Sequence, residues 1–124
     1  MFAIGAVAIA SHLLDHLTVG VKSSVQFDAV VALGVVTVIA AVVYPRLPRG
    51  VQSMGSIVLG ISWLTGDFFR HVLPMVRDGA QATDYTGLAA TLGGVLLIGA
   101  GVAAALRSPG AAAEPFPGAG RREA

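Results

Sequence analysis

Three histidines and one aspartate are the residues of this chain whose types and spacing most clearly suggest chemistry. His12 and His16 are four positions apart, and so are Asp67 and His71. Residues four apart lie on the same face of an α-helix. If two helices carry these pairs and pack against each other, three imidazoles and one carboxylate face one another.

The first two interpretations of this set of side chains are a structural role and metal binding. In the first, His16 pairs with Asp67, or Asp15 pairs with Arg70, and these interhelical bonds satisfy buried polar groups without any cofactor. In the second, the imidazoles and the carboxylate bind a divalent metal such as Zn²⁺, which accepts nitrogen and oxygen ligands tetrahedrally. We expect no cofactor and keep the metal as an alternative.

A b-type haem is a further alternative. Either His12 or His16, together with His71, would supply the two axial imidazoles. Against this, the helix rise places His12 and His71 at depths that differ by roughly 13 Å. Movement of protons or solutes, with Asp67 or Asp15 as the titrating carboxylate, is the last alternative.

Four apolar segments must position these side chains: 1–21, 27–44, 51–72 and 85–106. Each approaches or exceeds the roughly 20 residues that a helix needs to cross about 30 Å of hydrocarbon. Hydrophobic residues make up 55 % of the chain and charged residues 12 %, about half the charged share of soluble domains. We predict an all-α polytopic membrane protein, a four-helix transmembrane bundle with short loops that covers residues 1–107.

Local residues predict where the helices begin and end. Pro45 and Pro48 should end the second helix, and Pro74 should limit the third, because proline lacks the amide hydrogen that a helix interior needs. Asp84 is expected to cap the fourth helix. Asp28 lies in the first turn of the second helix, where its charge suits the helix dipole. Residues 108–124 are rich in Pro, Gly and Ala and are predicted to form a disordered tail.

Antiparallel packing would gather most ionisable residues toward one face of the membrane. Charges near lipid are costly, so they usually have partners or a function. We therefore count Asp15, Asp28 and Arg70 as supporting residues of the cluster. The basic residues on the side of the termini and the middle loop are Arg46, Arg49, Arg107, Arg121 and Arg122, against Lys22, Arg70 and Arg77 on the other side. The positive-inside rule then predicts a multi-pass protein of the cytoplasmic (inner) membrane with both termini cytoplasmic and the cluster facing outward.

Glycine occurs 16 times, and much of it lies inside the apolar segments. Gly87, Gly94 and Gly101 run along the fourth segment, and small residues let membrane helices approach closely. They could pack helices of one bundle, or they could form the face of a homo-oligomer or of a contact with a larger membrane partner. Both alternatives stay open.

Composition excludes several classes of function. Without cysteine the chain has no disulfides and no thiolate metal ligands. A net charge of +1 with scattered basic residues argues against nucleic acid as a partner. No nucleophile motif predicts an enzyme, and the Ala, Gly, Val and Arg bias resembles a high-GC bacterial genome. We expect a non-enzymatic accessory or packing subunit of a membrane assembly, with the lipid bilayer as its surroundings; the alternative is a metal- or haem-binding redox or transport component.

Overall fold

A computed structural model describes the backbone of residues 1–18 and 25–107, and the side chains of these residues except 25–27 and 83. Within these ranges every regular element is helical, which confirms the predicted all-α class. The predicted disordered tail, residues 108–124, and most of the first break lie outside the described residues. The elements are α1 (Phe2–Thr18), α2 (Val25–Val43), η1 (Tyr44–Arg46), α3 (Arg49–Asp67), η2 (Phe68–Val72), α4 (Leu73–Asp78) and α5 (Ala82–Leu106).

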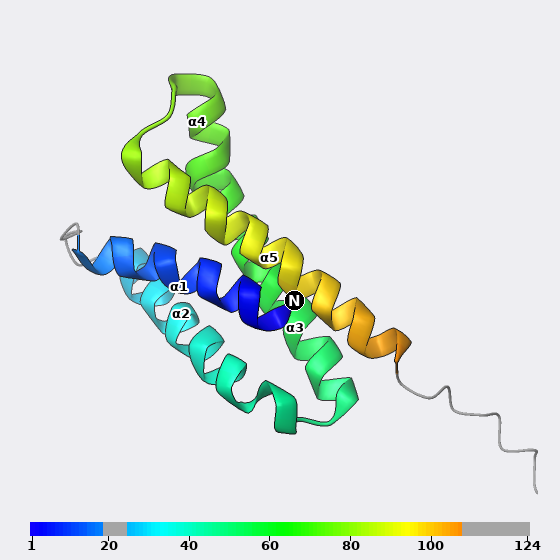
Figure 1. Cartoon of the computed structure of the whole chain (residues 1–124). Coiled ribbons are helices and arrows are strands. Elements are labelled where there is room, and N and C mark those ends of the chain that lie inside the picture. The colour runs from blue at the N-terminus through cyan, green and yellow to red at the C-terminus, as the bar shows by residue number, and fades with distance from the viewer. Residues whose placement is uncertain (19–24, 108–124) are drawn as a thin grey trace, which may run out of the picture.

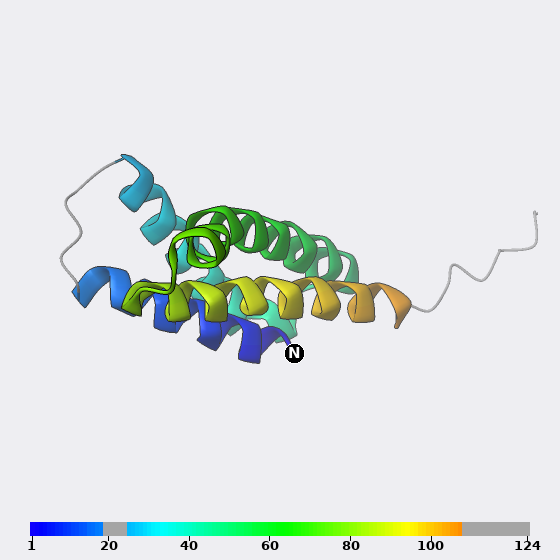
Figure 2. The same ribbon diagram turned by 90° about the horizontal axis from the view of Figure 1, so that it is seen from above.

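The longest helix, α5, runs through the middle of the bundle (Figure 1). It is antiparallel to both α1 and α3, which pack against it from two sides. Seen from above, α3 lies over α5 and α1 lies beside it (Figure 2). The contact between α1 and α2 completes the bundle, and the short turn η1 joins α2 to α3.

Glycines allow α5 to approach its two neighbours at backbone distance. A Cβ added to Gly94 would lie 2.8 Å from the carbonyl oxygen of Gly60, and one on Gly101 would lie 2.6 Å from a carbonyl oxygen of α3. On the other side, a Cβ on Gly93 would lie 2.8 Å from the carbonyl oxygen of Gly5. No larger side chain fits at these positions without moving backbone, so the small residues serve contacts within the chain.

The core between the helices is small and apolar. Its buried residues come from α1, α3 and α5: Phe2, Ala6, Ile9, Trp63, Ala90, Leu97 and Ala100. The indole Nε1–H of Trp63 donates a hydrogen bond of 2.9 Å to the hydroxyl of Thr37, which ties α3 to α2. Phe2 stacks on Tyr44 with ring centroids 4.1 Å apart and so holds the start of α1 against η1.

The third helix continues past the predicted end at Pro74, and that prediction is wrong. A π-helical turn, η2, follows α3, and α4 then extends the helix to Asp78. In η2 the amide of Leu73 donates to the carbonyl of Phe68, five residues earlier. This wider turn directly precedes Pro74, whose ring would clash with a carbonyl of a regular α-helix. The helix ends only before Gly79, whose φ of 91° suits glycine.

The start of α5 also differs from the prediction. Gln81 is the N-cap residue, and Asp84 lies inside the helix at its third position. The carboxylate of Asp84 accepts a hydrogen bond of 2.8 Å from the backbone amide of Gln81. The two residues form a reciprocal capping box, which leaves the second carboxylate oxygen of Asp84 free for another partner.

Two helices of the described part are long and apolar enough to cross a membrane. They are Asp28–Arg46 and Asp84–Leu106, while α1 is apolar but shorter. Large apolar side chains also point outward from α1, α2, α3 and α5, among them Val7, Leu14, Ile39, Val42, Met54, Val58, Leu92 and Val95. The bundle thus has a small core and an extensively apolar surface.

Candidate metal centre

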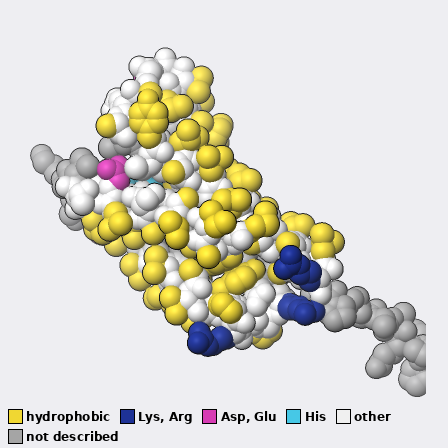
Figure 3. Space-filling model, viewed as in Figure 1, with side chains coloured by type: hydrophobic (Ala, Val, Ile, Leu, Met, Phe, Trp, Pro, Cys, Tyr) yellow, Lys and Arg dark blue, Asp and Glu magenta, His cyan; other side chains and the backbone are white. Residues whose placement is uncertain are grey.

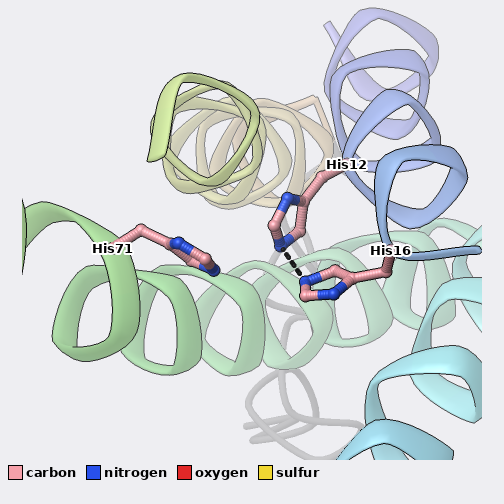
Figure 4. Close-up of side chains that lie close together, drawn as sticks. All are labelled: His12, His16 and His71. Carbon is pink, nitrogen blue, oxygen red and sulfur yellow. Dashed lines mark hydrogen bonds between the residues drawn. The ribbon is translucent and has the colours of Figure 1, made fainter. Parts of the chain in front are cut away.

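The structure brings His12, His16 and His71 together. One ring nitrogen of each lies within 4.8 Å of the others, and the ring centroid of His12 is 4.4 Å from that of His16 and 4.9 Å from that of His71. Figure 4 shows His71 reaching from η2 toward the two histidines of α1. Two segments more than fifty residues apart in the sequence therefore form one imidazole cluster.

Local packing fixes the position of each ring. His12 is fully buried where α1 crosses α5, and His16 follows one turn later at a half-buried position. The ring of His71 fills the space over Gly87, where any side chain would collide with it. Gly87 therefore supports a site residue, whereas the other two glycines singled out on α5 pack against α3. The π-helical turn that carries His71 is a type of irregularity often found at functional sites.

His12 is oriented by a chain of hydrogen bonds on the side away from the cluster. The hydroxyl of Thr86 donates to Oδ2 of Asp15 at 2.8 Å. Its oxygen is then available as an acceptor for Nδ1–H of His12 at 3.1 Å. This fixes the tautomer in which Nε2 of His12 carries a lone pair, and that atom faces the other imidazoles.

His71 has the same kind of support from Asp84. Its Nδ1–H donates to Oδ1 of Asp84 at 3.2 Å, while the capping box holds the carboxylate in place. In the neutral ring, Nε2 then carries the lone pair. Histidines that bind metals almost always donate their second nitrogen to a carboxylate, a carbonyl or a similar acceptor, so both rings have the support that metal ligands need.

Asp67 contributes an unusual carboxylate to the cluster. It is 4 % exposed, and its Oδ1 lies 3.6 Å from Nε2 of His12. Its Oδ2 has no hydrogen-bond partner within the part of the chain that the structure describes. His16 donates instead to Nε2 of His12, at 3.0 Å. The expected pair of His16 with Asp67 is therefore replaced by a contact of Asp67 with His12.

The three supporting residues are not equivalent in the structure. Asp15 belongs to the hydrogen-bond chain behind His12, and Thr86 takes the place that was expected for Arg70 as its partner. Arg70 is exposed and lines a cavity of about 130 Å³ between α2 and α3, which Asp67 also lines. Asp28 is exposed at the start of α2 and is not part of the imidazole cluster.

Sequence reasoning missed Thr86 as a positioning residue. It placed Asp84 at the start of the fourth helix and on the same face of the membrane as the histidines, but it gave Asp84 no histidine as a partner. A signal was present at the start of the fourth segment. Asp84 and Gly87 are three residues apart and share a helix face, and a polar residue beside a glycine on that face suggests a close polar contact.

The geometry does not fit a b-type haem. The expected depth difference between His12 and His71 is wrong. Gly5 of α1 and Gly60 of α3 contact adjacent residues of α5, so the two helices start at different levels, and the rings of His12 and His71 are in contact. The centroids of His16 and His71 are 6.1 Å apart, but the ring of His12 packs against both. The macrocycle would have to lie where His12 is.

No family model matches this chain, and neither a curated protein nor a solved structure does. The geometry of the cluster is therefore the basis for a functional proposal.

Proposed function

We propose that this protein binds one divalent transition-metal ion of the Zn²⁺ class through His12, His16, His71 and Asp67. The observation that carries the proposal is the convergence of three imidazole nitrogens within 4.8 Å of one another, beside Asp67, whose buried Oδ2 has no hydrogen-bond partner among the described residues. Zinc binds imidazole at about 2.0–2.1 Å, so the ligand atoms of a tetrahedral site are about 3.3 Å apart. Forming the site would require side-chain rotations that bring the nitrogens from within 4.8 Å of one another to this spacing, and His16 would have to present a nitrogen with a lone pair in place of the N–H that it donates to His12.

Counting donors and acceptors supports a cation in this position. Nε2 of His12 and Nε2 of His71 carry lone pairs, and Asp67 adds two carboxylate oxygens. Among the described side chains of the cluster, His16 supplies one N–H, which it donates to His12. Burying acceptors without donors costs free energy, which a bound cation would offset.

The chemistry of the ligands narrows the choice of ion. Three imidazoles with one carboxylate suit Zn²⁺ and neighbouring first-row ions, whereas Mg²⁺ and Ca²⁺ prefer oxygen ligands. A site with four protein ligands is typical of structural zinc. We therefore infer that the ion ties α1 to η2 across α5.

The apolar surface supports the membrane location that forms part of this proposal. Only 11 % of the stretch Asp28–Arg46 is buried, so this helix is unlike the core helix of a soluble protein. We propose four spans in the cytoplasmic membrane with both termini cytoplasmic. Figure 3 shows basic side chains at the end of the molecule where α5 ends, and an acidic side chain beside a histidine toward the far end.

The proposed metal centre would then lie just below the outer surface. Thr86, which contacts His12, is two residues inside the apolar stretch that begins at Asp84. This corresponds to a depth of about 3 Å along the helix. The role of a non-enzymatic accessory subunit stays a prediction, and a structural metal centre is compatible with it.

Metal titration of the purified full chain in detergent tests the proposal. We expect one Zn²⁺ per chain and, with Co²⁺ as a probe, the visible absorption of a tetrahedral site. His12→Ala, His16→Ala and His71→Ala should each remove this absorption, and Asp67→Asn should weaken binding. Asp28→Asn is the matched control for Asp67→Asn, because Asp28 is exposed and outside the cluster.

Two results would contradict the proposal. One is binding of less than one ion per chain with the wild-type sequence folded, as judged by circular dichroism and by the fluorescence of the buried Trp63. The other is unchanged stoichiometry and affinity in all three histidine variants.

A further inference from the structure

The end of the molecule opposite the histidine cluster is cationic. Arg46, Arg49 and Arg107 are exposed there. Nη1 of Arg49 donates a hydrogen bond of 2.7 Å to the backbone carbonyl of Arg107, which joins the start of α3 to the end of α5. The acidic residues of the described ranges belong to the other half of the bundle: Asp15, Asp28, Asp67, Asp78 and Asp84. The arginines therefore have no carboxylate partner within residues 1–18 and 25–107.

A polar cavity of about 220 Å³ lies between these arginines. It is lined by Tyr44, Arg49, Gln52, Ala100, Ala104 and Arg107. The side-chain amide of Gln52 donates to the carbonyls of Tyr44 and Leu47 at 2.9 Å each, and so fixes η1 as one wall of the cavity. Guanidinium groups recognise phosphate with paired hydrogen bonds, and two of them flank this cavity.

An apolar groove of about 480 Å³ lies on a different face of the same helix pair. It is lined by Gly50, Ser53, Met54, Ile57, Val58 and Ala105, none of which lines the polar cavity. Neighbouring positions of a helix point about 100° apart, so the groove is separate from the cavity. At the end that carries the arginines, Val51 and Leu106 are exposed apolar side chains.

We propose that this end binds one anionic phospholipid, with its phosphate between Arg49 and Arg107. The charge of the cavity selects the headgroup, and the exposed apolar side chains at this end suit the acyl chains. The inference rests on the membrane location proposed above but not on the metal centre. It assigns a ligand to the basic face that, in the proposed orientation, meets the cytoplasmic leaflet, where anionic lipids attract basic residues.

Native mass spectrometry of the full chain in detergent, titrated with phosphatidylglycerol or phosphatidylcholine, tests this assignment. We expect one phosphatidylglycerol to bind at concentrations where phosphatidylcholine does not. Arg49→Gln and Arg107→Gln should each weaken this binding about tenfold, since a hydrogen bond to a charged group contributes on that order. Arg77→Gln is the matched control, because it removes one positive charge from α4 at the other end.

Two further measurements separate the lipid from other anions and from misfolding. Dihexanoyl phosphatidylglycerol should bind more weakly than the long-chain lipid, because its short chains contact less of the apolar surface. Arg49→Lys keeps the charge but loses the paired hydrogen bonds, so it should bind more tightly than Arg49→Gln. Trp63 fluorescence confirms that each variant is folded.

Each opposite result would overturn the assignment. Equal binding of the two lipids, or equal weakening by Arg77→Gln, would show that no headgroup site exists at this end. Displacement of the lipid by equimolar inorganic phosphate would identify a site for free anions instead. His12→Ala should bind phosphatidylglycerol as the wild type does, so failure of the metal proposal would leave this result unchanged.

Discussion

The two ends of the α3–α5 pair use polar groups in opposite ways. At the η2 end, imidazoles and carboxylates from three segments converge. His12 donates to Thr86, Thr86 donates to Asp15, and His71 donates to Asp84, and these hydrogen bonds orient the rings. At the other end, arginines flank a cavity, and a backbone carbonyl holds one of them in place. One end presents lone pairs, which attract a cation, and the other presents N–H donors, which attract an anion.

In these two proposals, one helix pair separates two binding chemistries without a second domain. Glycine contacts hold α3 and α5 together between the ends, at Gly60 with Gly94 and again near Gly101. Neither end has a large core of its own. Both ends should therefore depend on the close contacts of Gly60, Gly94 and Gly101 between α3 and α5, which we call the seam.

The largest expected effect is the loss of stability when a glycine of this seam is replaced. Gly94→Ala should destabilise the chain by about 1–3 kcal/mol, because the new Cβ would lie 2.8 Å from backbone atoms of Gly60 and Leu64. Gly55→Ala is the matched control, since nothing lies within 4 Å of its added Cβ, and it should leave stability equal or higher by about 0.5–1 kcal/mol. Unfolding in denaturing detergent, followed by circular dichroism, measures both. Equal stability of the two variants would refute the role of the seam.

A substitution within the histidine cluster should weaken metal binding at one end and leave lipid binding at the other end unchanged. Thr86→Val removes the hydroxyl that links His12 to Asp15 and should weaken Zn²⁺ binding about 10–100-fold. Phosphatidylglycerol binding should not change. Thr65→Val is the control, because Thr65 is exposed and its hydroxyl donates to the carbonyl of Ile61 in its own helix. Competition with a chelator measures the affinity, and an unaltered value for Thr86→Val would remove this residue from the site.

A change of pH should affect metal binding and lipid binding differently, without any mutation. Zn²⁺ binds only neutral imidazole, and free imidazole titrates near pH 6.5. Lowering the pH below this range should release the ion as nitrogens gain protons, and raising it should restore binding. The guanidinium groups keep their charge throughout, so lipid binding by the arginines should persist. Parallel titrations of both ligands between about pH 5 and 8 test this; loss of both ligands together would mean global unfolding instead.

The smallest expected effect is a loss of stability at the hydrogen bond between Thr37 and Trp63, in the middle of the bundle. Thr37→Val removes the acceptor of the Trp63 indole and should cost about 1 kcal/mol of stability. The emission of Trp63 should shift, because its N–H loses its partner. Thr18→Val is the control, since its exposed hydroxyl bonds to the carbonyl of Asp15. A stability of Thr37→Val equal to that of this control would show that the hydrogen bond between α2 and α3 contributes nothing.

Much of the fold follows from the apolar segments, because their lengths and the prolines between them predict helices of nearly the observed extent. The spacing of His12 with His16 also predicts a shared face, which the structure shows. The predicted end of the third helix at Pro74 was wrong because a π-helical turn removes the steric conflict of the proline ring. No local sequence pattern predicts where such a turn occurs. The partners of His12 depend on how α1 meets α5, which is a property of the packed bundle and not of either segment.

The long separation of the histidines along the chain has a consequence for biosynthesis. The first two leave the ribosome early, whereas His71 emerges only after the second and most of the third helix have been made. The proposed ion could therefore bind with its full set of ligands only once α1 and η2 have come together against α5. Loading would mark the completion of insertion, and a nascent chain that stopped before η2 would lack the third imidazole ligand.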